Sequence, residues 1–229
     1  MNRRNFIQQM CQKMGCAFVL TSPLGSWLTG SSVQAEESQT HHSEPVTQNS
    51  KPMKIVVITG SPRRAGNSSY LADQFIKGAK EKDHEVFRFD AAFREVKPCI
   101  ACNKCGMDGP CAWNDSFSTV LRAKLLEADL ICLCSPMYYF GFTSQIKAVI
   151  DRFYAITNRL HGHKKACFLM TYANNSSHDE QPMRTHYQVL LDYMGWTNAG
   201  IVIAPGVWTA GSIKNTQYGQ QAYKLGKSL

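Results

Sequence analysis

Short runs of aliphatic and β-branched residues recur along this chain, each separated from the next by a segment long enough for a helix. Four runs are continuously apolar, at 54–59, 129–135, 166–171 and 199–204, whereas 84–90 (HEVFRFD) alternates. A continuous apolar run is typical of a strand buried on both faces, and alternation is typical of a strand nearer the edge of a sheet. Strands joined by helical crossovers are parallel, so we expect an α/β fold: a doubly wound sheet of five strands with helices on both faces.

The segments between these runs carry apolar residues at helical spacing. The clearest helix presents one face made of Ile146, Val149, Ile150 and Phe153. Further helices are predicted after the loop 60–69, from Asp115 onward, over 183–194 and from about 218 to 225. Together with the strands they predict one domain over 53–229, which is within the usual size of a single domain.

The composition excludes several classes of protein. Hydrophobic residues make up 44% of the 229 residues and charged residues 18%, which does not suit a disordered chain. The formal net charge is +8, but no run of five or six basic residues marks a nucleic-acid-binding stripe. No uninterrupted apolar run reaches ~18 residues, which excludes a polytopic membrane protein. We therefore expect no nucleic-acid partner and no stable membrane insertion.

The beginning of the chain resembles a twin-arginine export signal. Two adjacent arginines, Arg3 and Arg4, precede a mildly apolar stretch over 14–33 that ends in short residues. Residues 36–52 are polar, contain two prolines and lack periodic apolar positions, so they are predicted to be a linker. We expect a signal peptide over 1–35 and a periplasmic location. The alternative is a chance arginine pair in an extension of a cytoplasmic protein.

The loop after the first predicted strand, 60–69 (GSPRRAGNSS), has the residues of a phosphate site. It offers backbone amides at a helix start, three serine hydroxyls and an arginine, all of which favour an anion. A mononucleotide P-loop would end in Gly-Lys-Ser/Thr, but Gly66 is followed by Asn67. A dinucleotide loop would need a second glycine where Pro62 stands. We therefore expect a terminal monophosphate ester rather than a triphosphate or a pyrophosphate.

A second loop, 135–141 (SPMYYFG), follows the third predicted strand. In a parallel sheet this loop lies at the same edge as the phosphate loop, where ligands bind. Its three aromatic residues, methionine and proline would form a flat apolar wall for a planar heteroaromatic ring. A phosphate at one end and a flat ring at the other describe FMN.

These segments resemble a known family. Residues 58–68 (ITGSPRRAGNS), 135–141, Lys147 and 150–152 (IDR) are similar to the flavodoxin-like NADPH-dependent FMN reductase family, in the branch of iron–sulfur flavoproteins and multimeric flavodoxin-like reductases. The resemblance runs from about residue 53 to residue 229. It implies a flavodoxin-like sheet with the strand order 2-1-3-4-5.

The resemblance also implies which residues bind the cofactor. The FMN phosphate would be bound by Ser61, Arg63, Asn67, Ser68 and Ser69. The isoalloxazine ring would be lined by Pro136, Met137, Tyr138, Tyr139, Phe140 and Gly141. A third loop on the flavin side would be Tyr172-Ala173-Asn174.

The implied function is that of an FMN-dependent oxidoreductase. Hydride or electrons would pass from NAD(P)H or another donor through FMN to a small acceptor such as a quinone or a flavin. No side chain is assigned as a catalytic acid or base, because FMN does the chemistry.

The alternative is an electron carrier, of flavodoxin or iron–sulfur flavoprotein type, that serves a protein partner. Flavodoxin carriers are strongly acidic, whereas this domain is basic. A flavin-fold module without cofactor is disfavoured because both binding loops are kept. Relatives are commonly dimers or tetramers, so a homo-oligomer is expected.

Four cysteines are concentrated within 13 positions, at Cys99, Cys102, Cys105 and Cys111. Thiolates with this spacing on a loop can converge on one metal ion or cluster. The spacing matches the compact motif that iron–sulfur flavoproteins use for a [4Fe–4S] cluster. Structural zinc is a second explanation, and free thiols or two disulfides are a third. The other cysteines of the domain lie inside predicted strands and are expected to be small buried hydrophobes: Cys132, Cys134 and Cys167.

Charged residues on the helix after the aromatic loop are interpreted as structural. Lys147 and the Asp151–Arg152 pair are expected to form a salt bridge that anchors this helix. The sequence offers no Ser-His-Asp or Cys-His nucleophilic set. Histidines that fall in predicted loops or at a helix end are expected on the surface: His161, His163, His178 and His186.

Overall fold

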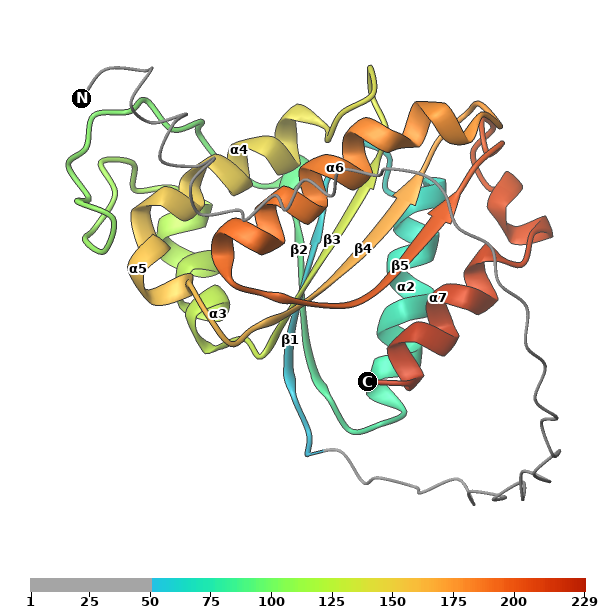
Figure 1. Ribbon diagram of the computed structural model, residues 1–229, viewed down its shortest axis with the longest axis horizontal. Coiled ribbons are helices and arrows are strands. Elements are labelled where there is room, and N and C mark those ends of the chain that lie inside the picture. The colour runs from blue at the N-terminus through green and yellow to red at the C-terminus, as the bar shows by residue number, and fades with distance from the viewer. Residues whose placement is uncertain (1–50) are drawn as a thin grey trace, which may run out of the picture. The chain divides into compact units, whose positions relative to one another are not determined.

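The computed structural model describes residues 51–229 and contains one sheet of five parallel strands (Figure 1). The strand order is β2-β1-β3-β4-β5, and every neighbouring pair is parallel. The strands are β1 (Lys54–Thr59), β2 (Glu85–Asp90), β3 (Leu130–Pro136), β4 (Lys165–Thr171) and β5 (Thr197–Ala204). The predicted doubly wound sheet of order 2-1-3-4-5 is therefore confirmed. The predicted export signal over 1–35 lies outside the described residues, as does nearly all of the predicted linker.

Helices cover both faces of the sheet. The α-helices are α2 (Asn67–Lys80), α3 (Arg122–Glu127), α4 (Ser144–Arg152), α5 (Thr157–Leu160), α6 (Ser177–Met194) and α7 (Tyr218–Lys227). Shorter helical turns are η1 (Ala91–Phe93), η2 (Phe117–Leu121), η3 (Phe153–Ile156) and η4 (Ser212–Asn215). One apolar core lies between the sheet and α2 with α7, and the other lies between the sheet and α3, α4 and α6. No helix within 51–229 is long and apolar enough to cross a membrane.

The three central strands explain three of the four continuous apolar runs of the sequence, and the fourth run, 199–204, lies in the edge strand β5 and is only partly buried. In β1 every residue after Lys54 is buried, and in β3 every residue before Pro136 is buried. Alternate residues of a strand point to opposite faces, so a strand between two helical layers needs apolar side chains at every position. β2 lies at the edge of the sheet and is only partly buried, which explains its alternating pattern.

Helices α2 and α7 pack closely against each other through two glycines. A Cβ at Gly78 would overlap the carbonyl oxygen of Tyr223, and a Cβ at Gly226 would overlap the carbonyl oxygen of Phe75. A side chain at either position would therefore force the two helices apart. This contact holds α7 directly against the helix that begins at the predicted phosphate loop.

Two helices differ from the sequence prediction in detail. The helix expected from Asp115 begins with the π-helical turn η2 (Phe117–Leu121) before it continues as α3. The predicted amphipathic segment 183–194 is the larger part of α6, which begins earlier, at Ser177, and has Pro182 inside it. Asp179 and Glu180 lie in the first turn of α6, where negative charge stabilises the helix dipole.

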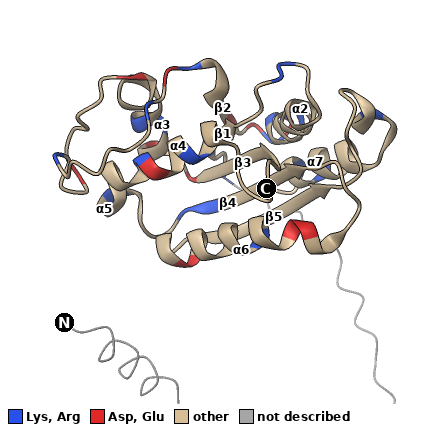
Figure 2. Cartoon of the chain, turned by 90° about the horizontal axis from the view of Figure 1, so that it is seen from above, with Lys and Arg blue, Asp and Glu red and all other residues tan. Residues whose placement is uncertain are grey.

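Charge on the domain is mixed rather than one-sided. Figure 2 shows Lys and Arg in blue interspersed with Asp and Glu in red over the described residues. Several of these charges are paired across the surface, as in Lys54–Glu127 and Lys227–Glu81.

Candidate functional site

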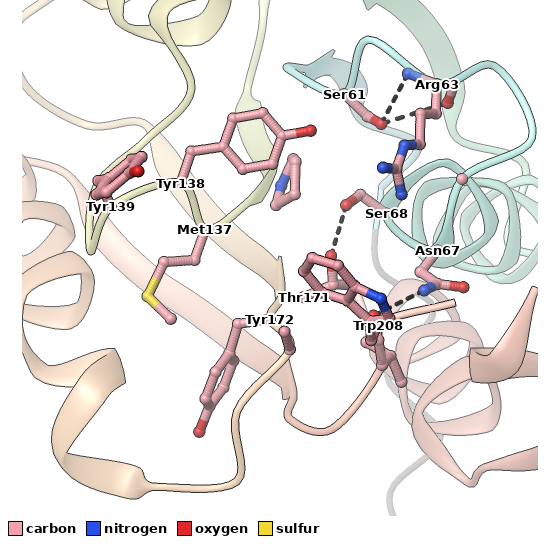
Figure 3. A pocket seen from close by; sticks show the side chains of 14 residues that line it. Ser61, Arg63, Asn67, Ser68, Met137, Tyr138, Tyr139, Thr171, Tyr172 and Trp208 are labelled. Carbon is pink, nitrogen blue, oxygen red and sulfur yellow. Dashed lines mark hydrogen bonds between the residues drawn. The ribbon is translucent and has the colours of Figure 1, made fainter. Parts of the chain in front are cut away.

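A pocket of about 380 Å³ opens at the edge of the sheet where the strands end (Figure 3). Loops that follow β1, β3, β4 and β5 contribute to it, which is the usual ligand position in a doubly wound sheet. The lining residues are Ser61, Arg63, Gly66, Asn67, Ser68, Pro136, Met137, Tyr138, Tyr139, Thr171, Tyr172, Ala173, Val207 and Trp208. We call this the flavin pocket below because of the ligand that the sequence predicts for it.

One end of the flavin pocket is the amino terminus of α2. Gly66 is the N-cap of this helix, and no side chain caps it within the described residues. The N–H groups of the first turn therefore point toward the pocket without a side-chain acceptor, which favours an anion there. Ser61 Oγ accepts a hydrogen bond from Arg63 N at 3.2 Å, and Ser68 Oγ lies 2.7 Å from Thr171 Oγ1. These two serines and Arg63 line this end of the pocket.

Gly60 allows the loop to approach α4 closely. A Cβ at Gly60 would overlap Thr143 Oγ1, which donates a hydrogen bond to the Gly60 carbonyl at 2.9 Å. Thr143 is the N-cap residue of α4. The loop after β1 is therefore anchored to the start of the helix that follows the aromatic loop.

Asn67 has a role that the sequence did not predict. Its side-chain Nδ2 donates to the carbonyls of Val207 and Thr209 at 2.9 and 3.0 Å, and its Oδ1 accepts from the N–H groups of Gly211 and Ile213 at 2.9 and 3.5 Å. These four bonds use the hydrogen-bonding capacity of the amide on protein groups. The side chain of Asn67 therefore holds the loop after β5 against α2, and only its backbone N–H remains for the predicted phosphate contact.

The opposite end of the flavin pocket is apolar. Pro136, Met137, Tyr138 and Tyr139 line it, and Figure 3 shows the Tyr138 ring reaching toward the pocket from the side opposite to Ser61 and Ser68, whereas the Tyr139 ring points away from it. Tyr138 and Gly141 exchange two backbone hydrogen bonds of 3.1 Å, which closes a tight hairpin with Tyr139 and Phe140 at its tip. We call residues 138–141 the aromatic hairpin.

Tyr172 forms a buried part of the same wall. Its hydroxyl lies 3.0 Å from Glu180 Oε2 and 3.2 Å from the Ser176 carbonyl. Burial and the Glu180 carboxylate raise the pKa of Tyr172 to about 12. The phenol is therefore neutral at physiological pH and contributes its ring and its hydrogen bond to the shape of the pocket.

Most of the predicted cofactor residues meet in this pocket, and three lie outside its lining. Ser61, Arg63, Asn67, Ser68 and Pro136 to Tyr139 line it. Ser69 instead hydrogen-bonds the Arg63 carbonyl and the Arg88 guanidinium at 3.3 Å each. Phe140 and Gly141 are absent from this lining, although Phe140 lines an adjoining hollow. The sequence missed three lining residues: Thr171, Val207 and Trp208.

The four clustered cysteines line a second, much smaller cavity of about 20 Å³. Cys99 and Cys102 are exposed, Cys105 and Cys111 are half-buried, and all four are free thiols. Within 51–229 no three Cys, His, Asp or Glu side chains approach closely enough to hold a metal ion. The loop thus brings the four thiols around one space without forming a closed ligand set.

The cysteine loop is closed at its neck by a buried ion pair. Arg152 and Asp115 have side chains that are 0% and 2% exposed, and Arg152 Nη1 donates to Asp115 Oδ2 at 2.7 Å. Arg152 also donates to the Lys97 carbonyl at 2.9 Å and to Ser118 Oγ at 3.0 Å. Burial by itself would raise the pKa of Asp115, but hydrogen bonds from Arg152 and from the Lys97 backbone hold it below its usual value. Arg152 therefore joins the end of α4 to both ends of the loop.

The salt bridge expected on α4 is present between Lys147 and Asp151, whereas Arg152 pairs outside this helix. Lys147 Nζ pairs with Asp151 Oδ1 at 2.5 Å on the surface, one helical turn apart. Arg152 pairs instead with Asp115, 37 positions earlier in the chain. Arg152 rather than Lys147 or Asp151 therefore anchors this helix.

Cys132, Cys134 and Cys167 are completely buried in β3 and β4, as predicted. Cys132 and Cys167 are register partners in the sheet. Burial raises the pKa of Cys134 and of Cys167 to about 12. These thiols stay protonated and behave as small apolar side chains.

Comparison with known proteins places the chain beside flavin-dependent proteins. The family model described as NADPH-dependent FMN reductase matches residues 53–213. An iron–sulfur flavoprotein of Methanocaldococcus jannaschii is 38% identical over 100 residues, 44% of this chain and 51% of that protein. A putative NAD(P)H-dependent FMN-containing oxidoreductase of Bacillus subtilis is 21% identical over 67% of this chain and 86% of its own length. The chain spans about half the length of the curated iron–sulfur flavoproteins it matches.

The fold has a solved counterpart. The NAD(P)H:quinone oxidoreductase from Methanothermobacter marburgensis matches with a TM-score of 0.63 and 15% sequence identity, over 78% of this chain and 96% of that one. At this level of identity the match shows the shared fold.

Proposed function

The chain belongs to the NADPH-dependent FMN reductase family, and from this premise we propose that it is an FMN-dependent oxidoreductase that reduces a small acceptor. The donor is NAD(P)H or another reductant. With NAD(P)H, one proton and a quinone, the products are NAD(P)⁺ and the hydroquinone, so two electrons and two protons reach the acceptor. The observation that carries the proposal is the flavin pocket, which joins an uncapped helix terminus at one end to an aromatic wall at the other.

The residues of the pocket fit FMN in both chemistry and position. The N-terminal N–H groups of α2, the hydroxyls of Ser61 and Ser68 and the guanidinium of Arg63 would hold the phosphate. Met137 and Tyr138 would contact the flavin ring. FMN, when bound, supplies a ring that accepts hydride and passes electrons onward.

The protein contributes position and surroundings to this chemistry. Thr143 fixes the phosphate loop to α4 through the Gly60 carbonyl, and Asn67 fixes the loop after β5 to α2. Two of the loops that line the pocket are thereby fixed before a ligand arrives, one to α4 and the other to α2. Such preorganisation lowers the entropic cost of binding.

The proposal is tested by removing the phosphate contacts. The double variant Arg63→Ala with Ser68→Ala removes a charged and a hydroxyl contact, each worth ~1.5–3 kcal/mol when made to a charged group. We expect it to lose flavin on dialysis, as measured by absorbance of the retained protein. The matched control, Arg159→Ala with Ser228→Ala, changes two exposed residues that do not line the pocket and should keep its flavin. A double variant that keeps stoichiometric flavin would show that the phosphate site is elsewhere.

A second redox centre is proposed at the cysteine loop, in the form of a [4Fe–4S] cluster. Two observations support it: all four thiols line one cavity, and Arg152, which lines the same cavity, has a buried Nε without a hydrogen-bond partner among the described residues. An anionic sulfur centre would give that donor an acceptor, whereas neutral disulfides would not. The loop would have to open beyond its present volume to hold the cluster.

Metal analysis tests the cluster. Protein purified without oxygen should carry about four irons per chain and absorb broadly near about 400 nm in addition to the flavin bands. Cys102→Ser should lose the iron, and the control Cys132→Ser, which changes a buried strand cysteine, should keep it. Protein that contains zinc and no iron would favour the structural zinc site, and iron-free protein with paired thiols would favour disulfides.

We further propose two properties of the whole protein: that it is exported to the periplasm by the twin-arginine route, and that it acts as a homo-oligomer. A route that carries folded proteins would let the chain leave already loaded with FMN. Soluble NADPH is not expected outside the cytoplasm, so the donor there would be a membrane quinol or a protein. Replacing Arg3 and Arg4 with Lys should leave the protein in the cytoplasm on fractionation. The same location for both forms would contradict the proposal, and light scattering of the pure protein reports the oligomer.

A further inference from the structure

The loop 60–69, called the phosphate loop here, is organised around one backbone carbonyl. The carbonyl of Arg63 accepts hydrogen bonds from Gly66 N at 3.1 Å and from the hydroxyls of Ser61 and Ser69 at 3.3 Å each. Figure 3 shows how closely Ser61 Oγ approaches the Arg63 backbone, whose N–H also donates to it at 3.2 Å. A carbonyl oxygen repels a phosphate, whereas N–H groups attract it. The three donors therefore occupy the one backbone group of Arg63 that would oppose a phosphate.

Ser69 is in turn held by Arg88, a residue of the edge strand β2. Arg88 Nη2 donates to Ser69 Oγ at 3.3 Å, and Ser69 is buried. A guanidinium can only donate hydrogen bonds, and a hydroxyl has a single hydrogen of its own. Ser69 therefore acts as the acceptor toward Arg88 and directs its hydrogen to the Arg63 carbonyl. Arg88 thus acts on the phosphate loop through Ser69.

The Arg88 guanidinium connects three elements that meet at the phosphate loop. It contacts Ser69 and Asp73, one turn apart on α2. Its Nε donates to Asp90 Oδ1 at 2.8 Å, at the end of β2. Thr59 Oγ1, at the end of β1, donates to the same oxygen at 2.6 Å. A planar guanidinium holds several acceptors at fixed angles, so the first turns of α2 are fixed to the ends of β1 and β2.

Arg88 also balances two carboxylates beside the phosphate loop. Its side chain is 25% exposed and forms ion pairs with Asp73 and Asp90. Without its charge, two negative groups would remain next to the first turns of the helix whose amino terminus faces the flavin pocket. A phosphate monoester carries about 1.5–2 negative charges at pH 7 and would be repelled by them. A ligand without a phosphate would feel little of this repulsion.

We propose that Arg88 is a positioning residue for the cofactor phosphate. It holds the Arg63 carbonyl through Ser69, and it neutralises Asp73 and Asp90 near the phosphate. Arg88 is not among the described residues that line the flavin pocket, so its effect on the ligand is indirect. It thereby determines how strongly the pocket prefers FMN to riboflavin. The inference rests on the proposed function, because it concerns the phosphate of the same cofactor.

Titration of the full-length protein, freed of its flavin, with FMN and with riboflavin tests the proposal. Riboflavin has the same ring and side chain without the phosphate, so the ratio of the two dissociation constants measures the phosphate contribution. Arg88→Met should raise the dissociation constant of FMN about five- to thirtyfold and that of riboflavin at most about twofold. Arg88→Lys keeps the charge but loses the planar geometry, and should raise that of FMN about two- to fivefold. The control Arg159→Met removes an arginine that pairs with Asp108 at 3.8 Å, and the ratio should stay unchanged.

A second substitution tests the path through Ser69. Ser69→Ala removes the hydroxyl between Arg88 and the Arg63 carbonyl while Arg88 keeps its carboxylate partners, so FMN binding should weaken and riboflavin binding should not. In the Ser69→Ala background, Arg88→Lys should add little, because both changes break the same connection. Fully additive effects would refute the action of Arg88 through Ser69.

Thermal unfolding of the same samples distinguishes positioning from a structural role. A structural role alone would lower the unfolding temperature and weaken FMN and riboflavin equally, and this result would overturn the inference. If Arg88→Met does not fold, the milder Arg88→Lys and Ser69→Ala carry the test. A natural protein that binds neither flavin would refute the proposed function and the inference with it. A natural protein that prefers FMN, with the same preference in the Arg88 variants, would refute the inference alone.

Discussion

Replacing Arg152 with methionine should reduce the free energy of unfolding far more than the loss of any surface ion pair. The guanidinium is completely buried and makes four hydrogen bonds, two to Asp115 and one each to the Lys97 carbonyl and Ser118 Oγ. Methionine fills a similar volume but leaves the Asp115 carboxylate buried without its counter-charge. Removing one partner of a buried pair costs about 3–5 kcal/mol.

This magnitude is large enough to be measured in two ways. Urea unfolding followed by circular dichroism gives the free energy directly, provided that the slope with denaturant is unchanged. Thermal unfolding should shift by roughly 6–20 °C, because a domain of this size loses about 2–4 °C per kcal/mol. The matched control is Lys147→Met. Its pair with Asp151 is 45% and 40% exposed, so its loss should cost at most about 1 kcal/mol.

A double-mutant cycle separates the pair from its surroundings. Asp115→Leu alone should also destabilise, because it leaves Arg152 charged and buried, whereas Asp115→Leu with Arg152→Met should recover much of the loss. Additive effects would mean that the two side chains do not interact. A cost below about 1 kcal/mol for Arg152→Met, equal to that of the surface control, would refute the assignment of the neck as a buried ion pair.

The Arg152–Asp115 pair should also make the stability of the domain depend on pH in the acidic range. The pKa of Asp115 lies below its usual value in the folded protein. Its contribution to stability is therefore present above the ordinary carboxyl pKa of about 3.9 and is lost as the pH falls through the folded value. The natural protein should lose stability in this acidic range more steeply than Asp115→Leu with Arg152→Met does.

Three further changes test other parts of the structure. Gly226→Ala should destabilise the domain by about 1–3 kcal/mol in urea unfolding, because the new methyl group pushes α7 away from α2. An unchanged unfolding midpoint would show that the two helices are not in close contact. Asn67→Ala should cost about 2–3 kcal/mol and make residues 205–213 newly sensitive to protease, because four hydrogen bonds to that loop are lost; equal cleavage would mean the loop is held by other contacts. Burial lowers the pKa of His84, whose Nδ1 accepts a hydrogen bond from Met53 N at 3.1 Å. The folded protein therefore binds a proton here less readily than the unfolded chain does, so stability should fall as the pH drops below about 6.5. This part of the pH dependence should be absent in His84→Gln.

The sheet was predictable because each strand is recorded locally in the sequence. Central strands β1, β3 and β4 need apolar side chains on both faces, which explains their short continuous apolar runs. The edge strand β5 carries a similar run although it is only partly buried. Element ends were less predictable, since α6 begins before the apolar pattern does. Its first turn, Ser177 to Glu180, is polar and is stabilised by charge at the helix terminus rather than by a buried face.

The site was predictable where chemistry is concentrated in a short loop. The loops 60–69 and 135–141 stand out by composition, and residues of both line one pocket. Val207 and Trp208 carry no such signal, because what brings them to the pocket is Asn67, about 140 positions earlier in the chain. Arg152 likewise pairs with a distant residue. Adjacent positions on a helix point in different directions, so its neighbour Asp151 was never a suitable partner.

The neck of the cysteine loop has a consequence for how such a chain can change over evolution. Arg152 and Asp115 hold the two ends of the loop together, and Ser116 N donates to the Glu95 carbonyl at 3.0 Å beside them. When a loop begins and ends at the same place on a fold, it can be exchanged, lengthened or removed without changing the rest of the fold. The entropic cost of closing such a loop grows only slowly with its length. The loop is thus an interchangeable cassette. The proposed cluster would then be gained or lost by substitution within the cassette, independently of the parallel sheet and of the pocket at its edge.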